Sequence, residues 1–375
     1  MVGYGYPNKE AAAMADMFEY LTWRGDIPFS AMGPNPVDGL IFSTLVYVNF
    51  SAAAPHTPYS RVPLHRAVMT LLADAEATKR IRVERDLELL AAVAASERFR
   101  QVEIGFYRDI FIPEEDTQFA AMTFFLNDGS AYAAFRGTDY SLVGWKEDFN
   151  MSFLDHIPAQ RLAAEYLRDL AAIFSGPIHV GGHSKGGNLA IYAAAMAGED
   201  IQDRILDVAN YDGPGFMEHI LSHPGYDRIV PKCRTYLPQS SFFGMLLDRE
   251  EPHTIIKSRQ IGLLQHEPYS WEIIGAGFVP DTLHADSLFV NKTMKSWLAS
   301  MTTEERNEFF DAVFGLLMTD NTANVWDMLR PQTVLAYIRN LRANEPMRNL
   351  LTTELDKLVQ SAKQVTGGKN NEQCG

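Results

Sequence analysis

Residues 178–192 place one serine, Ser184, between a short β-branched strand and a run of good helix formers. Gly182 and Gly186 lie two positions either side of it, which makes the pattern Gly-x-Ser-x-Gly of a nucleophile elbow. In such a strained strand–turn–helix connection, a Cβ at either glycine would collide with the neighbouring strand or helix. The segment therefore predicts that Ser184 is a nucleophile on a sharp turn. The alternative interpretation is a glycine-rich turn with a purely structural role.

Strands alternate with helices on both sides of this turn. We expect strands at residues 102–111, 119–126, 131–135, 206–211, 234–237 and 254–257, and a helix at residues 158–174. Asn127, Asp128 and Gly129 form a strong hairpin-turn signal between two of the strands. This alternation is typical of an α/β fold in which a mostly parallel sheet is covered by helices on both faces.

Both ends of the chain have helical patterns. Helices are expected within about residues 9–100, before the sheet, and again after about residue 290, where the strand signal fades. A capping box from Thr302 to Glu305 begins one of the later helices. We therefore expect a domain over residues 1–290, a helical C-terminal extension over 291–365 and a disordered polar tail over 366–375.

The charge balance excludes several partners. A net charge of −14, with no basic stretch to offset it, argues against nucleic acid and against broad binding to anionic membranes. No signal-peptide pattern and no apolar run of ~18 residues is present. Cys233 and Cys374 do not suggest a disulfide framework, so a cytoplasmic setting is the expectation. The sequence predicts no oligomeric state.

No cofactor or metal is expected. His179 and His183 straddle a strand and a turn, whereas His219 and His223 lack a third ligand and a following glutamate. The glycine run around Ser184 lacks the order of a phosphate-binding loop.

A nucleophilic serine needs a base, and the base needs an acid to orient it. In elbow enzymes the chain order is serine, acid, histidine. We predict His266 as the base, because it follows the last strand by a loop long enough to reach the carboxyl edge of the sheet. His253 lies at the beginning of that strand and is the fallback.

Two carboxylates compete for the role of acid. Asp212 directly follows the strand at 206–211 and is preferred, although a turn aspartate bonding to its own backbone is the simpler interpretation. Asp248 follows the next strand and is the alternative acid.

The transition state also needs hydrogen-bond donors for its oxyanion. The backbone N–H of Lys185, at a helix N-terminus, is one predicted donor, and Thr138 after Gly137 is the other. The Lys185 side chain either attracts an anionic substrate group or pairs with a surface acid. Residues 242–247 form either an apolar lid over the site or plain core.

Several blocks of this sequence resemble known families. Residues 135–138 and 182–187, with Trp145 and Asp148, resemble the class-three lipase branch of the α/β hydrolases. Residues 20–26, 183–188, 211–215 and 265–268 resemble more closely an uncharacterised bacterial family of lipase-like hydrolases, known only as a domain of unknown function.

The resemblance spans roughly residues 15–275. It implies an α/β-hydrolase fold and a serine-hydrolase activity with Ser184 as nucleophile, His266 as base and Thr138 at the oxyanion hole. Class-three lipases carry their acid in an Asp-x-Val-Pro-like segment after the later strand, and this chain lacks that segment.

The expected function is hydrolysis of a carboxylic ester, with a lipid-like or other small-molecule acyl ester as substrate, through an acyl-enzyme on Ser184. A catalytically silent hydrolase fold that acts as a binding module is the main alternative. A thioesterase or lysophospholipase would share the same machinery.

Overall fold

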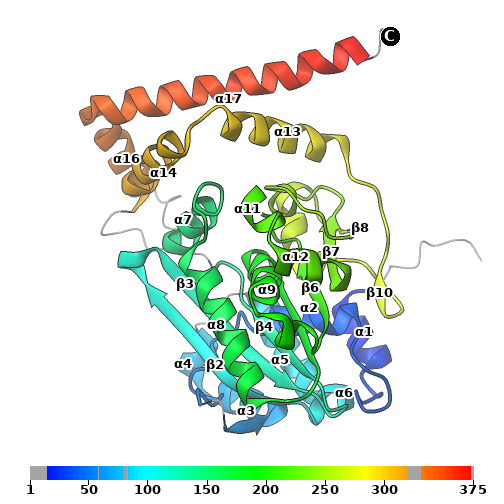
Figure 1. Cartoon of the computed structure of the whole chain (residues 1–375). Helices are drawn as coiled ribbons and strands as arrows, with labels where there is room; N and C mark the ends of the chain where they lie inside the picture. Colours follow the sequence, from blue (N-terminus) through cyan, green and yellow to red (C-terminus); the bar gives the residue numbers. More distant parts are fainter. Residues whose placement is uncertain are drawn as a thin grey trace, which may run out of the picture.

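The computed structural model describes residues 15–57, 59–79, 81, 83–139, 141–318 and 331–372. Within these ranges, eight strands form the main sheet in their order along the chain, β1 to β8 (Figure 1). Their bounds are β1 (Arg61–Pro63), β2 (Glu103–Ile112), β3 (Thr117–Phe125), β4 (Ala131–Phe135), β5 (Ile178–His183), β6 (Ile205–Tyr211), β7 (Cys233–Pro238) and β8 (His253–Ile256). Strands β1 to β4 pair antiparallel, and β4 to β8 pair parallel. A small hairpin, β9 (Ile273–Ile274) and β10 (Gly277–Phe278), follows.

The helices are distributed over both faces of the sheet and over its carboxyl edge. The first twelve are α1 (Met17–Arg24), α2 (Pro36–Leu45), α3 (Leu64–Ala73), α4 (Ala75–Lys79), α5 (Glu84–Ala95), α6 (Glu97–Arg100), α7 (Leu142–Asn150), α8 (Pro158–Ile173), α9 (Lys185–Ala195), α10 (Glu199–Gln202), α11 (Glu218–Leu221) and α12 (Pro224–Ile229). The C-terminal helices are α13 (Ala285–Ala299), α14 (Thr303–Leu317), α16 (Pro331–Ala343) and α17 (Glu345–Glu372).

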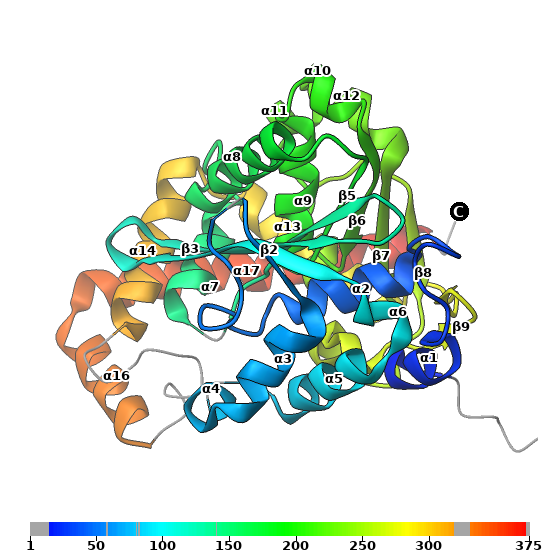
Figure 2. The ribbon, with the colours of Figure 1, turned by 90° about the horizontal axis from the view of Figure 1, so that it is seen from below.

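Chain order in the sheet decides which helices cover which face. Because β4 to β8 lie side by side in sequence order, right-handed crossovers bring the connecting helices α8, α9 and α12 to the same face. These helices pack on one another and form one apolar core with the sheet. In Figure 2 they lie on one side of the sheet, and α1, α2, α3 and α5 lie on the other.

The N-terminal helices are therefore an integral layer of the fold. Asn35 caps α2 and Pro36 opens it, and every residue from Val37 to Leu45 is buried against the sheet. The buried pair Arg98–Asp38, with 2.6 Å between Nη2 and Oδ2, ties α6 to the same helix. The predicted mostly parallel sheet with helices on both faces is confirmed, and its arrangement resembles the expected α/β-hydrolase fold. Strand boundaries agree with the predicted ones to within two residues.

The C-terminal helices lie across the carboxyl edge of the sheet, above α7 and α11 in Figure 1. Buried aromatic residues join them to the segment around α7: Phe153, Trp297, Phe309, Phe310 and Phe314. Since α13 begins at Ala285, the expected boundary between residues 290 and 291 falls inside a helix.

Helix α17 continues to Glu372, so residues 366–372 of the predicted tail are helical in the structure. Once a helix has formed, each further residue adds one hydrogen bond at little cost, and Thr366 Oγ1 adds a bond to the carbonyl of Ala362 at 2.8 Å. Residues 9–14, at the start of the region where the N-terminal helices are expected, lie outside the described residues. Residues 373–375 of the tail do so as well. No helix in the described ranges is long and apolar enough to span a bilayer.

Candidate active site

Ser184 occupies the turn between β5 and α9 with φ 58° and ψ −134°. A backbone with positive φ costs a residue with a Cβ on the order of 1–3 kcal/mol, so it persists only where the surroundings enforce it. Close contacts around the two flanking glycines, Gly182 and Gly186, enforce this backbone conformation. A Cβ on Gly182 would lie 2.2 Å from the carbonyl of Gly186, and a Cβ on Gly186 would lie 2.1 Å from the carbonyl oxygen of Phe135. The predicted turn geometry is therefore present.

The structure brings Asp212 and His266 together. Asp212 directly follows β6 and its side chain is 1% exposed. His266 Nδ1 donates to Asp212 Oδ2 at 2.7 Å, and Ser241 Oγ donates to the other carboxylate oxygen. A buried carboxylate bonded to Nδ1–H holds the imidazole in the tautomer that leaves Nε2 unprotonated.

His266 ends a 3-10 helix (Gly262–His266) in the loop after β8, and His183 fixes this loop beside the elbow. His183 directly precedes Ser184, and its Nε2 donates to the carbonyl of His266 at 2.8 Å. The rings of His183 and His266 lie 4.5 Å apart between centroids, and Tyr47 Oη lies 3.0 Å from His183 Nδ1. Ser184 Oγ and His266 Nε2 are not hydrogen-bonded to each other here, as is common before substrate binds.

The sequence did not single out His183 as a functional residue. Its place directly before the nucleophile was the available signal.

The alternative residues lie elsewhere. The side chain of Asp248 is 72% exposed and pairs with Lys295 at 2.6 Å. Its backbone forms a bridge with Phe216. His253 begins β8, at the end of the strand opposite to the loop that carries His266. Neither Asp248 nor His253 is therefore placed to complete a triad.

The segment that carries Thr138 passes directly against the nucleophile. A Cβ on Gly137 would lie 2.9 Å from Ser184 Cβ and 2.5 Å from the carbonyl oxygen of His183, so only glycine fits. Thr138 Oγ1 donates to the Asp148 carboxylate, at 2.7 and 2.6 Å from its two oxygens. Because the hydroxyl is engaged in this way, only the backbone N–H of Thr138 remains to serve an oxyanion.

The Lys185 side chain is buried, and its contacts differ from both predicted alternatives, an anionic substrate group and a surface acid. It is buried, its Nζ lies 2.6 Å from Glu147 Oε2 and 3.8 Å from Asp148 Oδ1, and it donates to the carbonyl of Gln118 at 3.0 Å. Neither a substrate anion nor a surface acid is its partner. The reason is α7, which the sequence pattern did not reveal and which carries both acids beneath the elbow.

The same helix gives the site an unusual carboxyl group. Burial raises the pKa of Asp148 to about 6, although the charge of Lys185 and the hydrogen bond from Thr138 act in the opposite direction. Sequence reasoning noted Asp148 only within the family resemblance. Its contact with Thr138 depends on how α7 packs.

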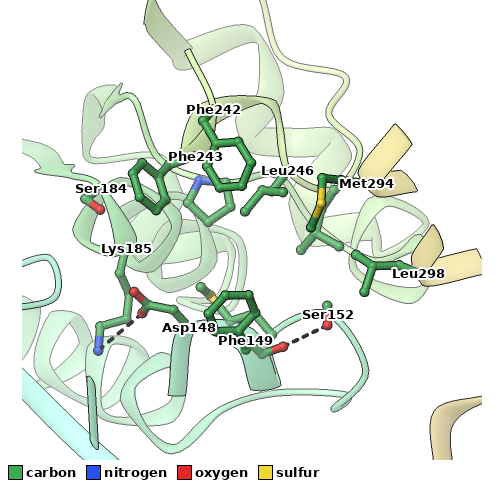
Figure 3. Close-up of a pocket in the computed structure, with 13 residues that line it drawn as sticks. Asp148, Phe149, Ser152, Ser184, Lys185, Phe242, Phe243, Leu246, Met294 and Leu298 are labelled. Atoms are coloured by element: carbon green, nitrogen blue, oxygen red, sulfur yellow. Dashed lines mark hydrogen bonds and ion pairs between the residues drawn. The ribbon is translucent and has the colours of Figure 1, made fainter. Parts of the chain in front are cut away.

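An apolar pocket with a volume of about 50 Å³ lies beside Ser184 (Figure 3). Its main apolar walls are Phe149, Phe242, Phe243, Leu246, Met294 and Leu298. The segment 242–247, considered above as lid or core, thus borders the pocket, and the ring of Phe243 lies 4.5 Å from that of His266. Among the described residues, no three His, Cys, Asp or Glu side chains are placed to hold a metal ion.

A comparison with protein-family models gives a match that covers this part of the chain. The family model described as Mbeg1-like matches residues 93–315, a span that includes Ser184, Asp212 and His266. No curated protein sequence matches the chain.

Two solved structures are similar at low identity. The native propeptide complex of Rhizomucor miehei lipase has 12% identity and a TM-score of 0.39, over 64% of this chain and 81% of the lipase. M37 lipase has 13% identity and a TM-score of 0.36, over 80% of this chain and 98% of the lipase. Because the family model covers more than half of the sequence, this chain belongs to the Mbeg1-like family.

Proposed function

We propose that this chain is a serine hydrolase that cleaves a carboxylic ester through an acyl-enzyme on Ser184. The observation that carries the proposal is the 2.7 Å hydrogen bond between His266 and the buried Asp212. This pair lies at the carboxyl edge of the sheet. There His183, the residue before Ser184, forms a hydrogen bond with the backbone of His266. A nucleophile, an acid and a base are thus available directly after β5, directly after β6 and in the loop after β8.

Each residue has a defined role in the proposed reaction. Ser184 Oγ attacks the ester carbonyl carbon while His266 Nε2 accepts its proton, and Asp212 stabilises the imidazolium that forms. The backbone N–H groups of Lys185 and Thr138 donate to the oxyanion of the tetrahedral intermediate. Lys185 is the first residue of α9, so its N–H has no partner within the helix and lies at the positive end of the helix dipole.

The second half of the reaction reverses these roles. Collapse of the intermediate breaks the bond to the alcohol, which leaves with the proton from His266, and the acyl group stays on Ser184. A water molecule then attacks the acyl-enzyme with His266 as base. The carboxylic acid is released and Ser184 regains its proton.

The main reason for considering a silent binding module was the missing acid after the later strand. Asp212, from the strand before it, offers a buried carboxylate bonded to the histidine, and this favours the enzyme. Thioesters and lysophospholipids would use the same residues. The apolar pocket beside Ser184 favours an apolar acyl group over a charged one.

A fluorophosphonate probe tests the proposal, because it reacts only with an activated serine. We expect the wild-type protein to be labelled at Ser184 and to hydrolyse acyl esters. The Ser184→Ala variant should be neither labelled nor active while retaining its circular dichroism spectrum. A folded wild-type protein that resists the probe and hydrolyses no ester would refute the proposal. Ester and thioester pairs with the same acyl group then separate esterase from thioesterase.

A further inference from the structure

One wall of the pocket beside Ser184 comes from the C-terminal helices. Met294 and Leu298 lie one turn apart on α13 and therefore share a face of the helix. Both line the pocket across from Ser184, and Phe149 of α7 lines the same pocket (Figure 3). Part of the pocket wall thus comes from a segment more than a hundred residues after the nucleophile.

A polar stripe holds α13 in place. Four contacts connect it to the loop after β7: the His284 N–H to the Gln239 carbonyl at 2.8 Å, Ser287 Oγ to the Ser241 carbonyl at 2.5 Å, Asn291 Nδ2 to the Met245 carbonyl, and Lys295 Nζ to Asp248 at 2.6 Å. These four residues recur three or four positions apart, so they form one stripe along the helix. The helix is therefore fixed along its whole length against the loop that borders the pocket.

Packed side chains join α13 to the other C-terminal helices. Trp297, next to Leu298, donates from Nε1 to the carbonyl of Glu354 in α17 at 2.9 Å. Trp297 also stacks edge-on against Phe309 of α14, with 5.5 Å between ring centroids. Because Trp297 is held in this way, the adjacent Leu298 cannot move far without disturbing the contacts of α13 with α14 and α17.

The volume of the pocket limits what it can hold. A cavity of about 150 Å³ accepts benzene, so the 50 Å³ beside Ser184 has room for roughly two to three carbon atoms. An acyl group of two to four carbons fits if its carbonyl stays at the mouth, above Ser184. Each further methylene would press on the wall formed by α13.

We propose that the substrate is an ester of a short acyl group, of about two to four carbons, and that Met294 and Leu298 set this limit. The inference rests on the proposed function and specifies its substrate class. One methylene in an apolar pocket is worth roughly 10- to 200-fold in kcat/KM. The length of the acyl chain is therefore a sensitive reporter of where the pocket ends.

The test is the chain-length profile of kcat/KM for p-nitrophenyl acetate, butyrate, hexanoate and octanoate. For the wild type we expect a fall of at least tenfold from butyrate to octanoate. In the double variant Met294→Ala/Leu298→Ala, the octanoate-to-butyrate ratio should rise at least tenfold. Leu298→Phe should act in the opposite direction and reduce butyrate relative to acetate. Leu288→Ala is the matched control, because Leu288 lies on the same helix but is 40% exposed, and its profile should equal that of the wild type.

The outcomes separate the inference from the proposed function. If the fluorophosphonate probe labels every variant but the profiles are all alike, the pocket limit is wrong and the hydrolase remains. A wild type with a higher kcat/KM for octanoate than for butyrate would also show that the pocket limit is wrong. If the folded wild type is neither labelled nor active on any ester, the proposed function itself fails. Should the double variant not fold, the profile of Leu298→Phe decides alone, since an unchanged acetate-to-butyrate ratio would overturn the inference.

Discussion

Ser184 and Asp212 occupy corresponding positions on adjacent parallel strands. Each directly follows its strand, β5 or β6, and each has a positive φ, 58° and 56° respectively. The residues before them, His183 and Tyr211, are register partners in the sheet. The proposed nucleophile and the proposed acid therefore leave the same edge of the sheet from turns that both have a positive φ.

The first prediction concerns the acid. Replacing Asp212 by Asn removes the acceptor that fixes the His266 tautomer, and in an enzyme of this mechanism that loss reduces kcat by about 10⁴-fold. Asp248→Asn changes an exposed side chain and should leave kcat within about twofold of the wild type. Steady-state hydrolysis of a p-nitrophenyl ester by both variants checks this. A large loss in the Asp248 variant alone would mean that the acid is assigned wrongly.

The strained turn leads to a second prediction. Glycine adopts the Ser184 backbone without the strain of about 1–3 kcal/mol, and it loses about 0.5–1 kcal/mol through its greater freedom in the unfolded chain. Ser184→Gly should therefore be more stable than Ser184→Ala by about 1 kcal/mol. Urea denaturation of the two inactive variants measures the difference. Equal midpoints would mean that the strain is no larger than the roughly 0.5–1 kcal/mol that glycine loses, which is below the range expected here.

The raised pKa of Asp148 yields a pH-dependent prediction. Its carboxyl group binds a proton more tightly in the folded protein, with a pKa of about 6, than in the unfolded chain, where it has the ordinary value of 3.8. Between these values the folded state holds more protons, so this group lowers the stability as pH rises from about 4 to 6. Asn at this position does not titrate.

Relative to the wild type, the free energy of unfolding of Asp148→Asn should therefore increase over that interval by about 1–3 kcal/mol and be constant above it. Chemical denaturation at pH 4, 5, 6 and 7.5 tests the trend. A difference that is the same at all four values would contradict it.

The buried pair of Lys185 and Glu147 gives a fourth prediction. Lys185→Met would leave Glu147 buried without its partner, which costs about 3–5 kcal/mol of stability. Adding Glu147→Gln should restore part of that loss, because the unpaired charge is then absent. Lys295→Met is the control, since its exposed pair with Asp248 is worth only about 0–1 kcal/mol. If both lysine variants lost equal stability, the buried Lys185–Glu147 pair would contribute no more to the free energy of unfolding than the exposed pair.

The amino-acid sequence alone determined the features that depend on neighbouring residues. The glycines around Ser184 act through contacts within a single turn, and β4, with its hairpin turn, follows from local patterning. Chain order and the position of loops after strands were enough to predict His266, which the structure places in contact with Asp212.

Only the tertiary structure decided the rest. Whether Asp212 or Asp248 contacts His266 depended on which loop reaches the histidine, 54 positions from Asp212. The partners of Lys185 lie on a helix that the sequence pattern did not reveal, and the wall made by Met294 and Leu298 depends on how α13 docks. The physical reason is that steric rules within a turn act between adjacent residues, whereas buried charges and pocket walls arise from packing between segments that are far apart in the chain.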